Sequence, residues 1–284
     1  MPPLKKTNAI MTVMIILSMT VTYLIISRNL ILFYINMKNK RLMAATVLAF
    51  FLLTALTFSC KSYPPSFDVE KFYTESDNTI DFIEDKSYIA LLPKNEAGEY
   101  YTEKGIIFYP GGLVDYHAYI PLLTRCAENK TACFIVKMPL NFAFMDKQAA
   151  GKFLNLYPEI NNWYIAGHSL GGAIAASYIS LHAKDFKGLI LLAAYSTHDI
   201  SKKNLKVLSL YGSNDKVLNL EHYHKYQKKL PAIGSGLTEI IINGGNHAQF
   251  ASYGNQDGDG IADISAEEQQ SITAAEIASW MELK

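Results

Sequence analysis

The sequence is poor in cysteine and has no excess of either charge. Only three cysteines occur among its 284 residues, and none has the Cys/His spacing typical of a zinc site. Lysine plus arginine and aspartate plus glutamate both total 26, so the formal net charge is zero. Because nucleic-acid binding needs basic residues in excess to neutralise phosphates, we expect no nucleic-acid partner. We also expect no bound metal.

Internal repeats and low-complexity tracts are also absent, and long apolar runs occur only in the first 60 residues. The first run, residues 9–26, is long enough to span a bilayer. A spanning segment placed directly before a second, signal-like run is an unusual arrangement. We therefore expect that translation begins at Met37 and that residues 1–36 are a mis-annotated extension. The alternative is that they form a membrane segment.

The second apolar run, residues 42–58, has the organisation of a bacterial secretory signal. Three basic residues precede it: Lys38, Lys40 and Arg41. Residues 37–60 resemble a lipoprotein signal in which Cys60 is lipidated after cleavage, although Thr57 stands where leucine is usual. A plain membrane anchor and an ordinary signal peptide are the alternatives. We expect an exported protein that is tethered to a membrane of the bacterial cell envelope.

The rest of the chain alternates between strand-like and helix-like segments. Residues 61–78 are polar and contain prolines, which favours a linker, and residues 79–284 form one domain. Strands are expected at 79–85, 87–93, 105–110, 132–139, 162–169, 188–195, 205–212 and 238–244. Helices are expected at 116–127, 146–156, 170–183, 220–230 and 265–283. Alternation with apolar strands predicts an α/β fold whose mostly parallel sheet is covered by helices on both faces.

The other two cysteines, Cys126 and Cys133, fall between an expected helix end and the next strand. In an oxidising compartment they could form a disulfide. The same spacing suits two buried thiols, and the sequence leaves both possibilities open.

One short motif points to catalysis. Residues 164–172 read YIAGHSLGG, which places Ser169 between a predicted strand and a predicted helix. A sharp turn at this junction lifts a serine hydroxyl above the sheet, and small neighbours are needed because the turn is strained. The helix N-terminus also stabilises negative charge as it develops there. The pattern predicts that Ser169 is a nucleophile rather than an ordinary turn serine.

A serine nucleophile needs a base, and the base needs an acid to orient it. Asp215 lies just after the expected strand 205–212, and His247 follows the last strand. Both therefore belong at the carboxyl edge of the sheet, with Ser169. Asp199 is the rival acid, and Asp215 could instead only cap the following helix. The alternative for His247 is a loop histidine bonded to backbone, and His168 is expected to shape the turn.

The sequence FYPGGLV after the strand 105–110 predicts half of an oxyanion hole. Its glycines allow the backbone to approach a substrate closely. We expect the backbone N–H of Gly112 to act with that of Leu170, the residue after the nucleophile. Leu113 is an alternative by one residue of register, and a plain turn is another.

The motifs FYPGG, VKMPLN, AGHSLGG, LYGSND and GGNHAQF, in this order, resemble the alpha/beta-hydrolase superfamily, and more narrowly a group of small bacterial proteins of that fold. The resemblance covers about residues 79–283. It implies a serine hydrolase that cleaves an ester or related acyl bond of a small substrate through an acyl-serine, with no cofactor. An acyltransferase on the same triad and a non-catalytic binding lipoprotein are the alternatives.

Only a short segment separates the expected strands at 188–195 and 205–212, so we expect no large cap and an open site. Phe142, Phe144 and Met145 could line it or belong to the core. Residues 255–263, NQDGDGIAD, imitate part of a calcium loop, but Ala266 stands where such a loop has a bidentate glutamate. We expect a solvated acidic loop there.

Overall fold

The computed structural model describes residues 62–75 and 78–283. The expected extension 1–36, the signal 37–60 and the lipidation site Cys60 lie outside these residues. The described residues belong to one compact unit, Lys61–Lys284. None of the helices in the described ranges has the length and apolar character needed to span a membrane.

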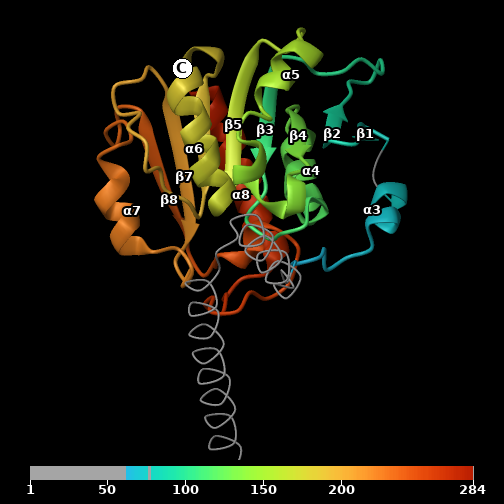
Figure 1. Cartoon of the computed structure of the whole chain (residues 1–284). Helices are drawn as coiled ribbons and strands as arrows, with labels where there is room; N and C mark the ends of the chain where they lie inside the picture. Colours follow the sequence, from blue (N-terminus) through green and yellow to red (C-terminus); the bar gives the residue numbers. More distant parts are fainter. Residues whose placement is uncertain (1–61, 76–77, 284) are drawn as a thin grey trace, which may run out of the picture. The chain divides into compact units, whose positions relative to one another are not determined.

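An eight-stranded sheet forms the centre of the unit, in the order β1-β2-β4-β3-β5-β6-β7-β8 (Figure 1). The strands are β1 (Ile80–Glu84), β2 (Tyr88–Pro93), β3 (Lys104–Tyr109), β4 (Ala132–Val136), β5 (Asn162–His168), β6 (Gly188–Leu192), β7 (Lys206–Gly212) and β8 (Leu237–Ile242). β1 and β2, which match the strands expected at 79–85 and 87–93, pair antiparallel, and β2 pairs antiparallel with β4. The six strands β3 to β8 are parallel to one another, so their carboxyl ends share one edge of the sheet.

Two separate cores cover the two faces of this sheet. On one face, α4 (Ile120–Glu128) packs against α8 (Ala266–Glu282), and their buried side chains join one cluster. On the other face lie α5 (Gly151–Leu156) and α6 (Leu170–His182), with a second cluster. Strands buried on both faces explain the continuous apolar runs in the sequence. The expected α/β architecture is confirmed.

The helices follow the expected pattern with three differences. The region expected as one helix at 116–127 begins as the short 3-10 helix η1 (Tyr116–Tyr119) and continues as α4. Within the region expected as one helix at 146–156, the helix α5 covers only residues 151–156, and the short 3-10 helix η3 (Ala143–Asp146) ends at the first residue of that region. The helix α7 (Leu220–Gln227) ends before Lys228. Residues 193–205, between β6 and β7, contain no helix, so no cap domain covers the site from this position. Cys126 and Cys133 are buried free thiols, and burial raises the pKa of Cys133 well above its usual value.

The segment expected as a linker is partly structured. Residues 69–75 form the helix α3 (Val69–Glu75). Before it, the backbone N–H of Tyr63 donates to the carbonyl of Leu113 at 2.8 Å, and the carbonyl of Tyr63 accepts from Asp115 N–H at 2.9 Å. The Tyr63 ring also lies 5.3 Å from that of Tyr253. Composition could not predict these contacts, because they use backbone groups and residues far away in the sequence. The segment was therefore expected to be a free linker.

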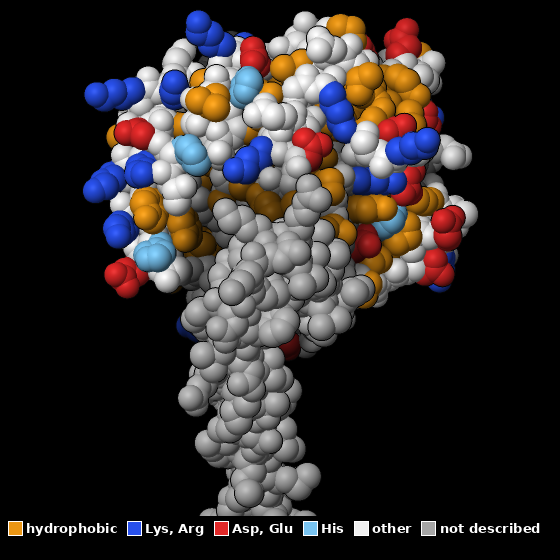
Figure 2. Space-filling view, viewed as in Figure 1, with side chains coloured by type: hydrophobic (Ala, Val, Ile, Leu, Met, Phe, Trp, Pro, Cys, Tyr) orange, Lys and Arg blue, Asp and Glu red, His pale blue; other side chains and the backbone are white. Residues whose placement is uncertain are grey.

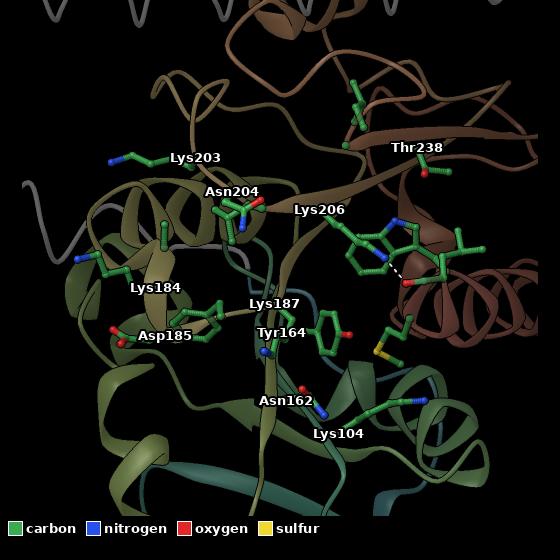
Figure 3. A pocket seen from close by; sticks show the side chains of 18 of the residues that line it. Lys104, Asn162, Tyr164, Lys184, Asp185, Lys187, Lys203, Asn204, Lys206 and Thr238 are labelled. Atoms are coloured by element: carbon green, nitrogen blue, oxygen red, sulfur yellow. Dashed lines mark hydrogen bonds between the residues drawn. The ribbon is translucent and has the colours of Figure 1, made fainter.

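The amino ends of the parallel strands surround a large open cavity of about 1500 Å³ (Figure 3). Six lysines line it: Lys104, Lys184, Lys187, Lys202, Lys203 and Lys206. Glu103, Asp185 and Glu282 line it as well, and Lys104 forms an ion pair with Glu282. Figure 2 shows that basic and acidic side chains are interspersed on the viewed face, which agrees with the zero net charge.

Candidate active site

Ser169 occupies a strained turn at the carboxyl end of β5. Its backbone has φ 52° and ψ −123°, a conformation that side chains other than glycine rarely adopt. Ser169 is also the N-cap residue of α6, but its side chain makes no capping hydrogen bond. The hydroxyl is therefore not used to stabilise the helix. The expected strand–turn–helix context of the motif is present.

The glycines of the motif are needed for close backbone packing. A Cβ atom at Gly171 would lie 2.1 Å from the carbonyl oxygen of Tyr109, and one at Gly167 would lie 2.5 Å from the backbone of Gly171. Both distances are far below van der Waals contact. The start of α6 can therefore approach the carboxyl ends of β3 and β5 only when these positions carry no side chain.

Asp215 and His247 form a buried carboxylate–imidazole pair beside this turn. The Asp215 Oδ2 to His247 Nδ1 distance is 2.9 Å, and both side chains are almost fully buried. The second carboxylate oxygen, Oδ1, accepts from the N–H groups of Val217 at 2.9 Å and Leu218 at 2.7 Å. These bonds fix the carboxylate, so Oδ2 points at the imidazole. Since an ionised carboxylate only accepts hydrogen bonds, Nδ1 carries a proton in this contact.

Asp199, the rival acid, does not take part. Its Oδ1 accepts from the N–H and the hydroxyl of Ser201 within its own loop. Within residues 78–283 no hydrogen bond joins the Ser169 hydroxyl to His247. The ring of His168, the residue before Ser169, lies 4.7 Å from the His247 ring, so the turn of Ser169 and the loop of His247 are adjacent. Hydrogen bonds between a nucleophile and its base often form fully only when substrate is bound.

His168 links the site's loops through a buried chain of hydrogen bonds. The Tyr119 hydroxyl accepts from Gly111 N–H at 2.8 Å and lies 2.8 Å from His168 Nδ1. His168 Nε2 lies 3.1 Å from the His247 carbonyl oxygen. Since a carbonyl only accepts, Nε2 carries the proton, and the Tyr119 hydroxyl donates to Nδ1. This neutral histidine therefore connects the loop after β3, which contains Gly111, to the loop after β8, which contains His247.

The protonation states support this assignment. Burial lowers the pKa of His168 well below its usual value, and the neighbouring His247 lowers it further. Burial also raises the pKa of Tyr119 well above its usual value. Both groups are therefore neutral near pH 7, as the chain of donors requires. The expectation that His168 shapes the turn fits this geometry.

The structure distinguishes between the two candidate oxyanion donors after β3. The N–H of Leu113 donates to the carbonyl of Asn141 at 2.8 Å, so it is not available to a substrate. The N–H of Gly112 has no hydrogen-bond partner among the described residues. A Cβ atom at Gly112 would lie 3.0 Å from the Leu170 side chain. Gly112 therefore lies against Leu170, the other expected donor, which begins α6 and has a free first-turn N–H.

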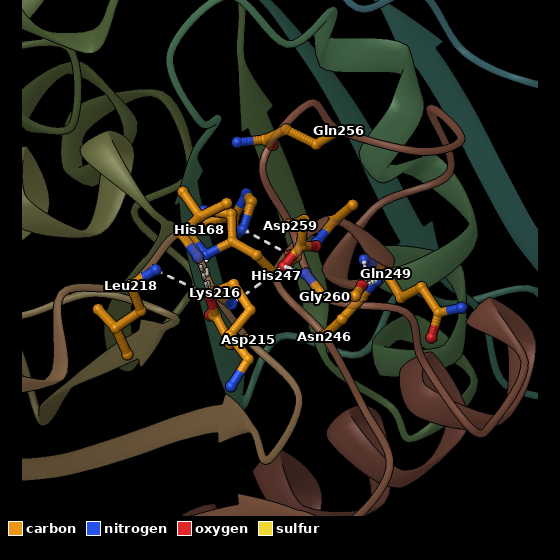
Figure 4. A network of polar contacts seen from close by, with 12 residues as sticks. His168, Asp215, Lys216, Leu218, Asn246, His247, Gln249, Gln256, Asp259 and Gly260 are labelled. Carbon is orange, nitrogen blue, oxygen red and sulfur yellow. Dashed lines mark hydrogen bonds and ion pairs between the residues drawn. The ribbon is translucent and has the colours of Figure 1, made fainter. Parts of the chain in front are cut away.

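Asp259 is a residue of the site that sequence reasoning missed. Its Oδ2 accepts from Ala248 N–H at 2.9 Å, next to His247. Its Oδ1 accepts from Lys216 N–H at 3.2 Å, next to Asp215. One carboxylate thus joins the loop after β7, which contains Asp215 (the acid loop), to the loop after β8, which contains His247 (the histidine loop) (Figure 4). The neighbouring Gly260 fits so closely that a Cβ there would lie 1.8 Å from the Asn214 carbonyl oxygen.

The acidic segment 255–263 therefore has a structural use. Asn214 Nδ2 donates to Asp263 Oδ2 and to the Ile261 carbonyl, both at 2.9 Å. The Asn246 side chain donates to the Gly260 carbonyl at 2.8 Å. In the described parts of the chain, no cluster of three or more His, Cys, Asp or Glu side chains has the arrangement of a metal site. In the sequence, the only sign of these contacts is an acidic segment that follows soon after His247.

Several apolar residues after β4 are exposed. Phe144 and Met145 belong to η3 and are exposed, and the rings of Phe142 and Phe144 lie 5.0 Å apart. Phe144 and Met145 are therefore not core residues. Leu140, in the short 3-10 helix η2 (Pro139–Asn141), is 77% exposed.

Comparison with known proteins agrees with this geometry. Residues 105–271 match the profile of the alpha/beta hydrolase family. No curated protein matches the chain in sequence.

Solved structures share the fold at low sequence identity. Est1E from Butyrivibrio proteoclasticus is 13% identical, with a TM-score of 0.52, and the match covers 72% of this chain and 98% of that one. An alpha/beta hydrolase enzyme from the metagenome of lagoon sediments at Mar Chica, Morocco, is also 13% identical, with a TM-score of 0.52 over 71% and 98% of the two chains. An esterase of Pyrobaculum calidifontis is 15% identical, with a TM-score of 0.50 over 76% and 89%.

Proposed function

Since the chain belongs to the alpha/beta hydrolase family, we propose that it is a serine hydrolase that cleaves a carboxylic ester through an acyl-serine intermediate. The observation that carries the proposal is the buried Asp215–His247 pair at 2.9 Å, next to the strained turn of Ser169. Burying a carboxylate beside an imidazole costs free energy that packing alone does not require. The structural neighbour from Pyrobaculum calidifontis is named as an esterase, so an ester is the first bond to test.

In the proposed reaction, the Ser169 hydroxyl attacks the ester carbonyl while His247 Nε2 takes the hydroxyl proton. Asp215 keeps the imidazole in the required tautomer and stabilises its positive charge. The N–H groups of Gly112 and Leu170 stabilise the oxyanion. The protonated His247 then gives the proton to the leaving alcohol. A water molecule activated by His247 releases the acid and restores Ser169.

Hydrolysis of p-nitrophenyl acetate, butyrate and octanoate by the wild type and by Ser169→Ala tests this proposal. We expect turnover that falls by at least a factor of about a thousand in the variant. We also expect a fluorophosphonate probe to label the wild type and not the variant. Equal melting temperatures of the two proteins would show that the fold is retained. Wild-type turnover by Ser169→Ala would contradict the mechanism.

The same assays separate the alternatives. An acyltransferase would transfer the acyl group to an added alcohol or amine, and the acid product would fall as the acceptor rises. A binding module would show neither turnover nor labelling of Ser169.

A further inference from the structure

Exposed apolar side chains gather around the candidate site at the carboxyl edge of the sheet. Leu140, Phe144 and Met145 follow the carboxyl end of β4. Ile261, which is 89% exposed, lies two residues after Asp259, and Leu220 begins α7 after the Asp215 loop. Single exposed apolar residues are ordinary. Five at one edge, contributed by three different loops, indicate a surface that meets something apolar.

The chain also enters the domain at this edge. Ser62 Oγ donates to the Leu113 carbonyl at 3.2 Å and accepts from Asn141 Nδ2 at 3.0 Å. Tyr63 pairs with the backbone on either side of Val114. The first described residues therefore contact both the oxyanion loop and the apolar loop after β4. No long free segment separates them from the site.

The preceding sequence connects this edge to a membrane. The apolar run 42–58 and Cys60 are the expected anchor, and Cys60 lies two residues before Ser62. A fully extended chain covers about 3.5 Å per residue, so at most about 7 Å of chain separates Ser62 from a lipid on Cys60, and about 14 Å separates it from a spanning segment that ends at residue 58. Either form of tether, a spanning segment or a lipid on Cys60, brings the bilayer surface to the carboxyl edge.

We propose that the lipid bilayer covers this edge, and that Ser169 acts on the ester of a membrane amphiphile presented at the bilayer surface. This inference rests on the proposed hydrolase function and on the expected tether. The apolar side chains enter the interface, where such residues insert about 5–10 Å. No cap lies between β6 and β7, so an ester at headgroup level reaches the site without leaving the bilayer. Ser169 takes the acyl group and the alcohol leaves, and water then adds to the acyl-serine carbonyl and releases the acid.

Depth of insertion is the direct test, because it does not depend on activity. Two full-length variants are prepared, Met145→Trp and Leu181→Trp. Each is reconstituted in phosphatidylcholine vesicles with and without brominated acyl chains. Leu181 is 79% exposed and lines the cavity at the opposite edge. We expect the brominated lipid to quench the added tryptophan at position 145 and not at 181. Equal quenching at both positions, or none at 145, would overturn the proposal. Recovery of the wild-type protein without any membrane attachment would also overturn it.

A second test compares two substrates with the same leaving group. Full-length protein in vesicles hydrolyses p-nitrophenyl palmitate held in the bilayer and p-nitrophenyl butyrate in solution. For the double variant Leu140→Ser/Ile261→Ser, we expect the ratio of the palmitate to the butyrate rate to fall on the order of tenfold. The matched control is Leu181→Ser/Ile233→Ser at the amino edge, where Ile233 is 64% exposed.

The outcomes separate this inference from the proposed function. An unchanged ratio in the carboxyl-edge variant, or the same fall in the control, would overturn the docking of this edge while hydrolysis stands. If neither ester is hydrolysed, the proposed function fails. The quenching result would still show whether the edge meets lipid, but the substrate assignment would be lost.

Discussion

The two edges of the sheet differ in what they contain. The amino edge has the large cavity of about 1500 Å³, lined by lysines that are mostly exposed. The carboxyl edge has a buried carboxylate–imidazole pair and a serine with strained backbone. Exposed lysines around a cavity cost little, whereas buried charge and backbone strain are retained only when the surrounding structure compensates for them. Cavity volume is therefore a poor guide to chemistry in this protein.

The largest contrast between the edges is expected from Asp215→Asn. Because the N–H groups of Val217 and Leu218 hold Oδ1, the new amide NH₂ would occupy the Oδ2 position and face His247. It would donate to Nδ1 and force the proton onto Nε2, which removes the base. We expect kcat for p-nitrophenyl butyrate to fall about ten-thousandfold. The control is Lys203→Met at the amino edge, with unchanged kcat. Comparable losses in both variants would remove the distinction between the edges.

A smaller loss of activity is expected from Asp259→Ala. The substitution removes the carboxylate that accepts from Lys216 and Ala248, so the acid loop and the histidine loop can shift relative to each other. A shift of about 1 Å is enough to lower kcat between roughly ten- and a hundredfold. Asn255→Ala, an exposed change in the same segment, should leave kcat unchanged. Steady-state rates at saturating ester measure both. Equal rates for wild type and Asp259→Ala would show that Asp259 does not position the pair.

Replacing Ser169 by glycine should abolish activity and raise stability. Ser169→Gly removes the nucleophile and also relieves the positive φ, and no capping bond is lost because the serine side chain makes none. We expect the free energy of unfolding to rise by about 1 kcal/mol while turnover disappears. Denaturant melts of Ser169→Gly and Ser169→Ala measure the difference, since alanine keeps the strain. A glycine variant no more stable than the alanine variant would argue against strain at the turn.

The fourth prediction concerns pH. The pKa of His168 is far lower in the folded protein than in the unfolded chain, where it lies near 6.5. Below about pH 6.5 the unfolded state therefore binds a proton that the folded state does not, so stability falls as pH falls. The slope from this residue is at most about 1.4 kcal/mol per pH unit. His168→Gln, which keeps an acceptor and a donor, should lose this part of the slope between neutral and acidic pH. Parallel stability–pH curves for the two proteins would contradict a neutral, buried His168.

Much of the site was predictable because its signals are local. Ser169, Asp215 and His247 each follow an apolar strand, and the carboxyl ends of parallel strands share an edge, so their proximity follows from chain order. The sheet was predictable for the same reason, since its central strands are mainly apolar, as in β4 (ACFIV) and β6 (GLILL).

Other features depend on contacts between distant residues. Only the carbonyl of Asn141 distinguishes Gly112 from Leu113 as a donor. Asp259 sits in a segment that imitates a calcium loop, and its partners lie 43 and 11 residues away in sequence. No local pattern contains that information. Residues 62–67 likewise appeared to be a linker because their pairing uses backbone groups, which composition does not describe.

The pairing of Tyr63 has a consequence for proteolytic release. A protease that cut between Tyr63 and Val69 would free the domain from whatever holds residue 60. Tyr63 would leave with the discarded fragment, so the domain would lose the two backbone hydrogen bonds that join Tyr63 to Leu113 and Asp115. The oxyanion loop would then lose its outer brace at the moment of shedding. Under the proposed hydrolase function and the proposed tether, a shed form is expected to hydrolyse esters more slowly than the tethered one, so activity and attachment would be lost together.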